Sequence, residues 1–203
     1  MTRAPVTPRP WTVESSRAGY SDRFLTHRMD RCVTDRGHVL DPFHVLELKE
    51  WCHVVAVTDA GELVLVDEYR HGAGVVVRGL PAGTVEAGED PALAMPRELA
   101  EETGHTAPIW IRLPTMWANP AMQTNRVHNF LALGARATGG QKLDPGESIA
   151  VVLKPVAAAI GEIMTGAWTT HGLHVAAILA AREYALARAA GDPRLAPLAA
   201  PAV

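Results

Sequence analysis

The sequence predicts an α+β protein in which strands and a few helices form one sandwich. Short β-rich runs alternate with a few helical stretches, without the regular strand–helix–strand repeat of a parallel sheet. Hydrophobic residues make up 48% of the 203 residues and charged residues 20%, which is enough apolar side chains for a packed core. These proportions exclude a disordered chain, a collagen and a small disulfide scaffold.

The net charge indicates which partners to expect, and the cysteine content indicates the redox state of the thiols. The formal net charge is −3, so the chain lacks the basic surplus that binds a run of phosphates, and we expect no nucleic-acid partner. Its two cysteines, Cys32 and Cys52, do not form a CxxC motif or a disulfide framework. We interpret them as reduced thiols of a cytoplasmic protein.

The sequence also predicts neither secretion nor a membrane partner. The first 20 residues contain prolines and charges but no apolar core, unlike a signal peptide. Residues 163–181 carry no formal charge and are long enough to test as a membrane span. Gly166, His171 and His174 interrupt this stretch. They favour the end of one helix, a turn and the start of another.

The N-terminal part is expected to be an addition to the main fold. Residues 1–12 are predicted to be a loose arm. In residues 21–48, short strand-like runs alternate with turn residues, which predicts a small antiparallel β appendage. Two further β-rich runs, 53–57 and 63–66, flank Asp-Ala-Gly at 59–61 and predict a hairpin.

A helix is predicted to begin after Asp90. Asp90 suits the N-cap, Pro91 suits the first helical position, and Gly104 stands where a left-handed C-cap belongs. Pro96 lies inside this helix, where a proline costs about 3 kcal/mol. Two interpretations stay open: the regular helix begins one turn later, or Pro96 kinks the helix and re-aims Glu98.

The later elements follow from the same kinds of signal. Strands are predicted at 129–133 and 149–153, and helices at 156–164 and 173–189. The chain is therefore divided into three parts. These are an N-terminal arm and β appendage (1–48), a main domain (49–190) and a flexible tail (191–203).

Three glutamates on the first helix are candidates for chemistry. Glu98, Glu101 and Glu102 stand at i, i+3 and i+4, so they share one helix face with about 5–6 Å between neighbouring Cβ atoms. Arg97 is the only nearby cation, so a divalent cation would relieve their repulsion. Oxygen-only ligands suit Mg²⁺ or Mn²⁺. The spacing alone also fits an acidic, solvated helix face.

The surrounding residues favour the metal-binding interpretation. Residues 83–105 read GTVEAGEDPALAMPRELAEETGH. This segment resembles the Nudix box, G-x5-E-x7-R-E-U-x-E-E-x-G-U, where U is a bulky apolar residue. Every fixed polar and glycine position of the pattern is matched. The last apolar position is a departure, because it holds His105.

The resemblance implies a fold, a reaction and a metal. Nudix proteins are α/β/α sandwiches around a mixed β-sheet. They use Mg²⁺ or Mn²⁺ to hydrolyse a nucleoside diphosphate linked to another moiety. Carried over to this sequence, Glu98 and Glu102 are the principal metal ligands and Glu101 supports them. Arg97 and Glu89 are implied to pair and to orient the helix.

Segments outside the box resemble the ADP-ribose pyrophosphatase-like branch of the family. VDEYRHG at 66–72 is similar to that branch's QYRHG, and LPAG at 80–83 is similar to its ELPAG. In ELPAG the alanine carbonyl is a metal ligand, which adds Ala82. The acidic residue of the pattern is Gly79 here, and Pro120 lies about where the branch has a marker proline. The appendage commonly builds a dimer in this branch, so a homodimer is expected.

The catalytic base and the substrate contacts are less closely defined. In this branch a glutamate on a loop before a late strand often activates the water, and Glu147 matches that position. The alternative is that Glu147 is an ordinary exposed turn residue, in which case Glu101 is the expected base. Arg70 either binds a substrate phosphate or forms an ion pair with a residue such as Glu68, and Arg126 is ambiguous in the same way. The substrate loop is expected to include Asn119 and Pro120.

Three hypotheses about function follow. The leading one is metal-dependent hydrolysis of ADP-ribose or a nucleotide sugar, which gives a nucleoside monophosphate and a sugar phosphate. Hydrolysis of another nucleotide, such as a dinucleotide, a nucleoside triphosphate or a coenzyme, stays open because only the pocket decides and Gly79 departs from the branch. A non-catalytic nucleotide-sensing module is less favoured, because the glutamates of the box are intact.

Overall fold

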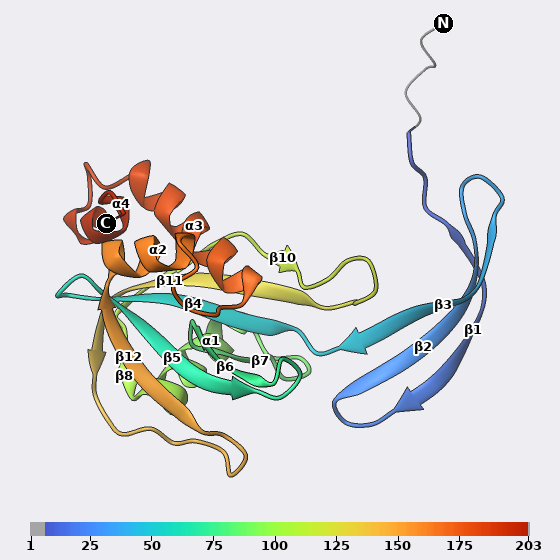
Figure 1. The fold of residues 1–203 in the computed structure, drawn as a ribbon, viewed down its shortest axis with the longest axis horizontal. Coiled ribbons are helices and arrows are strands. Elements are labelled where there is room, and N and C mark those ends of the chain that lie inside the picture. The colour runs from blue at the N-terminus through green and yellow to red at the C-terminus, as the bar shows by residue number, and fades with distance from the viewer. Residues whose placement is uncertain (1–6, 203) are drawn as a thin grey trace, which may run out of the picture. The chain divides into compact units, whose positions relative to one another are not determined.

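The computed structural model describes residues 7–202, which fall into two compact units (Figure 1). The N-terminal unit contains the chain up to Lys49 together with Trp117–Asn125. The main unit contains Glu50–Met116 and the chain from Arg126 onward. Of the expected arm at residues 1–12, the first half lies outside the described residues, and Thr12 already belongs to a strand.

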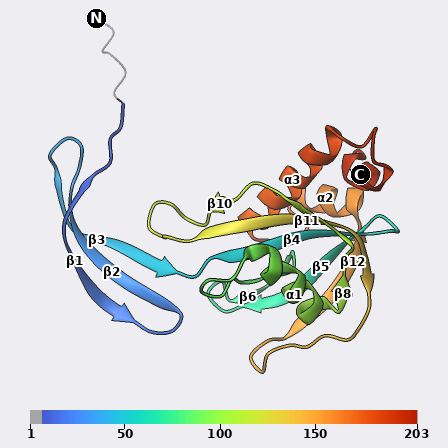
Figure 2. The same cartoon turned by 180° about the vertical axis from the view of Figure 1, so that it is seen from behind.

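The N-terminal unit is built on an antiparallel sheet, as predicted, and this sheet has three strands (Figure 2). Its strands, in spatial order, are β1 (Thr12–Ser21), β2 (Leu25–Val33) and β3 (Val39–Leu48). The Asp22 carboxylate accepts the N–H groups of Phe24 and Leu25 and so fixes the first turn. The sheet begins earlier than expected, because β1 pairs along its whole length with β2 although its own side chains stay exposed.

The main unit contains a mixed sheet with β4 (Trp51–Thr58) near its centre. β11 (Arg126–Ala137) pairs with β4 in parallel, whereas β5 (Glu62–Arg70) pairs with it antiparallel and completes the predicted hairpin. β12 (Ile149–Pro155) continues the sheet beyond β5. The remaining strands are short: β6 (Val75–Gly79), β7 (Ala82–Thr84), β8 (His105–Thr106), β9 (Ile109–Arg112) and β10 (Met116–Trp117).

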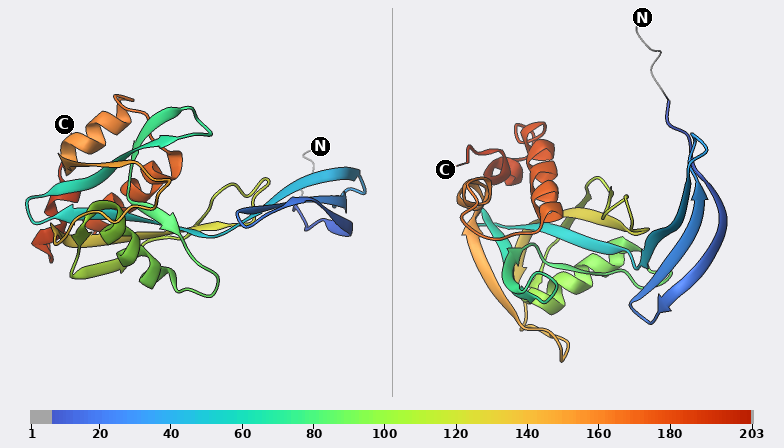
Figure 3. Two further views of the ribbon diagram at one scale, coloured as in Figure 1. Left: turned by 90° about the horizontal axis from the view of Figure 1, so that it is seen from below. Right: turned by 45° about the vertical axis from the view of Figure 1, so that its right-hand side comes forward.

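Helices cover both faces of this sheet (Figures 1 and 3). On one face, Val54, Ala56 and Val64 pack with the buried side of α1 (Pro91–Thr103). On the other face, the alternate side chains pack with α2 (Val156–Met164) and α3 (Gly172–Leu186); these are Val55, Val57, Leu63 and Leu65. Alternation along the strands therefore separates two cores, which gives the α/β/α sandwich that the family resemblance implied.

The first helix has the predicted caps but not the late start. Asp90 accepts the N–H of Ala92, and Gly104 adopts the left-handed conformation with φ 70°. The helix is continuous from Pro91, so Pro96 lies inside it rather than in its first turn. The late-start interpretation is therefore wrong, because the Asp90 cap and the Pro91 start determine where the helix begins.

The end of the chain also differs from expectation. Residues 191–203 were predicted to form a flexible tail, but they contain a 3₁₀ turn (Pro193–Leu195) and a short helix, α4 (Ala196–Ala199). Leu195 and Leu198 are buried in the core beside α2 and α3. Burial of two leucines gives this segment a fixed place that its Ala/Pro-rich composition does not indicate. Within residues 7–202, none of the helices has the length and apolar character needed to cross a bilayer.

Candidate active site

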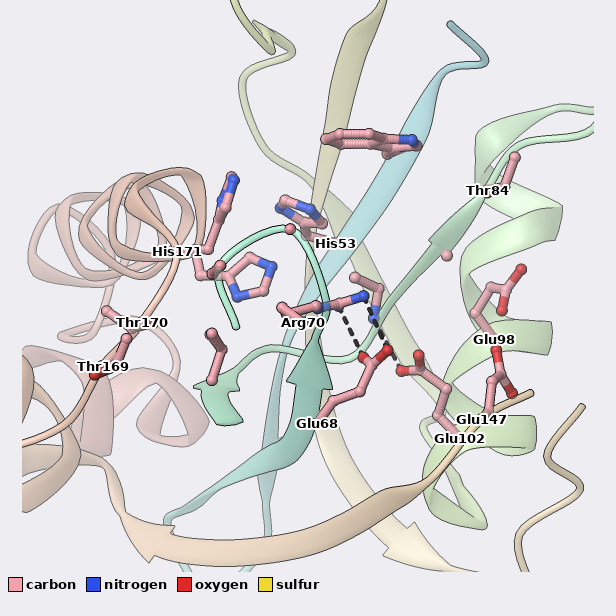
Figure 4. Close-up of a pocket in the computed structure, with 17 residues that line it drawn as sticks. His53, Glu68, Arg70, Thr84, Glu98, Glu102, Glu147, Thr169, Thr170 and His171 are labelled. Carbon is pink, nitrogen blue, oxygen red and sulfur yellow. Dashed lines mark hydrogen bonds and ion pairs between the residues drawn. The ribbon is translucent and has the colours of Figure 1, made fainter. Parts of the chain in front are cut away.

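A cavity of about 510 Å³ opens on the main unit, where β4, β5 and β7 meet α1 and the start of α3 (Figure 4). One end carries four carboxylates, from Glu68, Glu98, Glu102 and Glu147. The other end carries imidazoles and threonine hydroxyls, with Arg70 between the two groups in Figure 4. The structure thus brings residues from distant parts of the chain into one site.

Helix α1 presents the glutamates of the motif to this cavity. Its apolar side chains Ala94, Met95 and Leu99 are fully buried against the sheet. Because residues three and four apart share a face, this anchoring turns Glu98 and Glu102 toward the cavity. The helix position, and with it the carboxylate position, therefore depends on the packed core.

Glu102 is the most deeply buried carboxylate of the site, with 5% of its surface exposed. Its Oε2 accepts the N–H of Ala82 at 3.0 Å. Burial raises its pKa to about 8, and the nearby Glu68 and Glu98 carboxylates add to this, whereas the Ala82 hydrogen bond acts in the opposite direction. Such a group gains from a cation that would take up its negative charge.

Glu98 lies directly against the backbone of Gly83. A Cβ atom at residue 83 would come within 2.0 Å of the Glu98 carboxyl carbon, so only glycine leaves room for this carboxylate. Burial raises the pKa of Glu98, and the Arg97 guanidinium partly offsets that effect. The glycine that opens the sequence motif therefore has a steric role at the site.

Arg97 holds the acidic helix face together. Its guanidinium donates to Glu98 Oε1 at 2.9 Å and to Glu101 Oε2 at 3.0 Å. It also lies 3.4 Å from Glu89, which is the pair that the family resemblance implied. Glu101 is more exposed than Glu98 and does not line the cavity. Within this arrangement Arg97 is the cation that relieves the repulsion among the glutamates.

Glu68 and Glu147 complete the acidic end. Both oxygens of Glu68 bind the Arg70 guanidinium, at 3.0 and 2.9 Å, so the ion pair that the sequence left open is present and Arg70 also lines the cavity. Burial raises the pKa of Glu68. Glu147 lies in the loop before β12, where its carboxylate accepts the N–H of Asp144 at 2.9 Å.

The chemistry of this donor set fits a divalent cation. The acidic end offers only oxygen ligands, and burial, together with the neighbouring carboxylates, raises the pKa of Glu102. In residues 7–202, no three His, Cys, Asp or Glu side chains are arranged as a preformed metal site. The carboxylates of Glu98 and Glu102 are instead engaged with Arg97 and with the Ala82 N–H.

Three of the predicted substrate contacts lie outside the cavity lining. Asn119 and Pro120 belong to the N-terminal unit. There the Asn119 carbonyl accepts the N–H groups of Met122 and Gln123. Arg126 is in the main unit, and its guanidinium donates to Glu50 at 3.0 Å. Their assignment as substrate-binding residues remains a prediction.

Sequence reasoning missed the residues at the other end of the cavity. His53, His171 and His174 line it together with Thr169 and Thr170. In the sequence, His171 and His174 indicated only a turn and the start of a helix. The third histidine, His53, is on β4, far away in the sequence, so only the strand-to-helix packing reveals the cluster. One signal in the sequence did point to this end of the cavity: Gly79 stands in place of the acidic residue of the branch pattern.

Comparison with known proteins places this site in a family. The family model described as NUDIX domain matches residues 46–169, which is more than half of the chain. The chain belongs to the Nudix family. A solved structure described as "Crystal structure of ADP compounds hydrolase" has a TM-score of 0.79 at 20% identity, covering 94% of this chain and 100% of that chain. That likeness confirms the Nudix fold.

Two curated relatives are similar to this Nudix protein over part of their length. One is an ADP-ribose pyrophosphatase of Bacillus subtilis, 38% identical over 79 residues, which cover 39% of this chain and 43% of the relative. The other is an ADP-ribose pyrophosphatase of Mycobacterium tuberculosis, 33% identical over 129 residues, which cover 63% of this chain and 62% of the relative. The predicted similarity to the ADP-ribose pyrophosphatase-like branch is thereby confirmed.

Proposed function

We propose that this Nudix protein hydrolyses the pyrophosphate bond of ADP-ribose or a related nucleotide sugar, releasing a nucleoside monophosphate and a sugar phosphate. The observation that carries the proposal is the cavity where Glu98 and Glu102 meet Glu68, Glu147 and Arg70. The relatives named ADP-ribose pyrophosphatase support the substrate class. The hydroxyl- and imidazole-lined end offers space beside the acidic end for the rest of such a substrate.

The acidic end would hold Mg²⁺ or Mn²⁺. Glu98, Glu102 and the carbonyl of Ala82 are the proposed ligands, and Glu101 supports them through Arg97. When bound, the metal would neutralise charge on the pyrophosphate and lower the pKa of a water molecule. Breaking the Arg97–Glu98 contact would free that carboxylate for the cation, and Arg97 would keep its bonds to Glu89 and Glu101.

Glu147 is the proposed base for the attacking water. It lines the cavity on the same side as Glu98 and Glu102 in Figure 4, and its loop is separate from the helix that carries them. A base needs geometric reach before a suitable pKa, and this position gives it access to the cavity. Arg70 is the proposed phosphate contact, because its planar guanidinium can exchange one carboxylate oxygen for a phosphate oxygen.

Activity of a Glu102→Gln variant tests this proposal. Gln keeps the size and an oxygen acceptor for the Ala82 N–H but removes the charge that would bind metal. We expect kcat/KM for ADP-ribose with Mg²⁺ or Mn²⁺ to fall by about 100-fold or more. Glu162→Gln is the matched control, because Glu162 pairs with Lys154 outside the cavity. Full activity of Glu102→Gln would exclude the metal assignment.

A second candidate is hydrolysis of another nucleotide by the same acidic end. Gly79 stands in place of the branch's acidic residue, and the His174 imidazole occupies the adjacent space. The pocket therefore differs from the branch pattern at the end that would select the leaving group. A panel of nucleotide sugars, dinucleotides and nucleoside triphosphates, compared by kcat/KM, separates the two candidates.

A further inference from the structure

Three imidazoles gather at the end of the cavity opposite the carboxylates. His53 comes from β4, and His171 and His174 come from the start of α3. The rings of His53 and His174 meet edge to face at 4.4 Å between centroids. The His171 ring lies 5.2 Å from that of His174 and 6.4 Å from that of His53. The cluster is thus a continuous wall built from two distant segments.

Backbone hydrogen bonds determine the protonation of two of these rings. His174 Nδ1 accepts the N–H of Leu80, and His171 Nδ1 accepts the N–H of Leu173, both at 3.2 Å. A nitrogen that accepts a hydrogen bond carries no proton, so each ring is neutral and its proton is on Nε2. His171 and His174 therefore offer N–H donors without a positive charge.

Two further polar atoms at this end have no hydrogen-bond partner within residues 7–202. They are His53 Nδ1 and Thr170 Oγ1, and both residues line the cavity. His53 has only 3% of its surface exposed, so water does not readily satisfy its ring nitrogen. A buried polar atom without a partner costs roughly 1–3 kcal/mol. Both residues line the cavity, so a rotation of either side chain toward it would let a ligand supply the missing hydrogen bond.

Gly79 makes room for the cluster. A Cβ atom at residue 79 would come within 2.2 Å of His174 Nδ1. Any side chain at position 79 would displace the imidazole from its bond to Leu80. The position of the His174 imidazole therefore depends on glycine at residue 79. The imidazole occupies the space beside the position where the branch pattern has an acidic residue.

We propose that His53, His171, His174 and Thr170 bind the hydroxyl groups of the sugar attached to the pyrophosphate. A sugar hydroxyl both donates and accepts, as the hydroxyl of Thr170 and a neutral imidazole do. These rings carry no positive charge, so an anionic group would bind instead at Arg70, the proposed phosphate contact, which is paired with Glu68. The inference rests on the proposed function, because it names the residues that select the leaving sugar.

Binding to the metal-free protein tests this site separately from catalysis. Calorimetry would compare ADP-ribose and ADP-glucose with the methyl ester of ADP, which keeps the pyrophosphate charge but has no sugar hydroxyls there. Thr170→Val removes the hydroxyl at nearly constant size, and Thr170→Ser keeps it as the matched control. His53→Phe, which keeps a buried ring, is a second variant, and the Tm of each variant would establish that it folds.

We expect wild type to bind at least one ADP-sugar about tenfold more tightly than the methyl ester, as expected for one or two buried hydrogen bonds. That preference should fall below about twofold in Thr170→Val or His53→Phe and persist in Thr170→Ser.

Equal binding of sugar and methyl ester by wild type, or a preference that survives in both variants, would overturn the inference. Hydrolysis without a sugar preference would overturn this inference alone. A preference without hydrolysis in Mg²⁺ or Mn²⁺ would overturn the proposed function alone.

Discussion

Glu102 combines burial, a backbone hydrogen bond and nearby carboxylates in one residue. Its 5% exposure and its neighbours Glu68 and Glu98 disfavour the charged form. An isolated helix face would give such a carboxylate an ordinary pKa, so the perturbation comes from the tertiary structure. Perturbed carboxylates in a cavity are typical of functional sites.

The first prediction concerns the stability of the metal-free protein. The pKa of Glu102 is about 8 in the folded protein and about 4.5 in the unfolded chain. The folded state therefore holds its proton more strongly, and the free energy of unfolding should fall as the pH rises from about 4.5 to about 8. Above that window, Glu102→Gln should raise the Tm in a chelator by about 2–4 °C.

Thermal unfolding of both proteins at about pH 5 and about pH 8.5 measures this effect. The gain from Glu102→Gln should be larger at the higher pH. Glu162→Gln is the control, since the hydrogen bond from the Lys154 ammonium lowers the pKa of Glu162, so this residue does not titrate between about pH 5 and about pH 8.5. An equal gain at both values would contradict the prediction.

The second prediction tests the coupling of Gly79 to His174. Gly79→Ala should destabilise the protein by about 1–3 kcal/mol, because the new Cβ overlaps the imidazole. In the His174→Ala background that overlap is absent, so the same substitution should cost less than about 0.5 kcal/mol. Denaturant unfolding of the four proteins gives the coupling energy. Additive effects would show that the close approach is relieved elsewhere.

At the scale of elements, α1 combines strong end signals with an unfavourable interior residue. The Asp90 cap and the left-handed Gly104 define its ends as predicted from sequence. Pro96 supplies no N–H to the carbonyl one turn earlier, yet the helix continues through it. Sequence reasoning weighted the cost of Pro96 too heavily, because packing of Met95 and Leu99 against the sheet supports the helix on both sides of it.

The third prediction is that Pro96→Ala stabilises the protein. Alanine restores a helical N–H and removes the ring, which outweighs the greater freedom of the unfolded chain. We expect a gain of about 1–2 kcal/mol, measured as a rise in Tm of a few degrees. Arg97 and Glu98 follow directly, so kcat/KM should be measured too. A lower Tm would show that the helix around residue 96 is adapted to proline.

Other elements show which parts of the fold adjacent residues predict and which parts depend on distant contacts. Strands β4 and β5, helix α2 and the caps of α1 follow from residues adjacent in sequence, and the structure confirms them. β1 was not predicted, because its side chains are exposed and only pairing with β2 holds it in place. The buried Leu195 and Leu198 were also missed, since their burial depends on distant helices.

At the scale of the whole molecule, the two ends of the candidate site differ in how far sequence alone reveals them. Glu98, Glu101 and Glu102 are neighbours on one helix, so a short motif indicates them. His53 and His174 meet only because β4 packs beneath α3. The carboxylates proposed for bond cleavage were therefore predictable from sequence, whereas the groups proposed to select the sugar required the fold.

The last prediction is that the protein forms a homodimer. The three-stranded sheet of the N-terminal unit leaves Val13, Tyr20 and Phe24 more than half exposed, and a sheet of this size buries little apolar surface by itself. A second copy of the chain would cover such a surface. Light scattering should therefore give twice the 21.8 kDa of one chain.

Substitution on β1 should separate the copies if this sheet forms the interface. Tyr20→Lys places a charge on the exposed strand, where pairing with a partner would bury it, and should shift the measured mass toward one chain. Met164→Lys is the matched control, because Met164 is similarly exposed but lies on α2 in the main unit. If wild type has the mass of one chain, the homodimer is excluded. If Tyr20→Lys remains a dimer, the interface lies elsewhere, because a lysine at the centre of a buried apolar contact would weaken it by several kcal/mol.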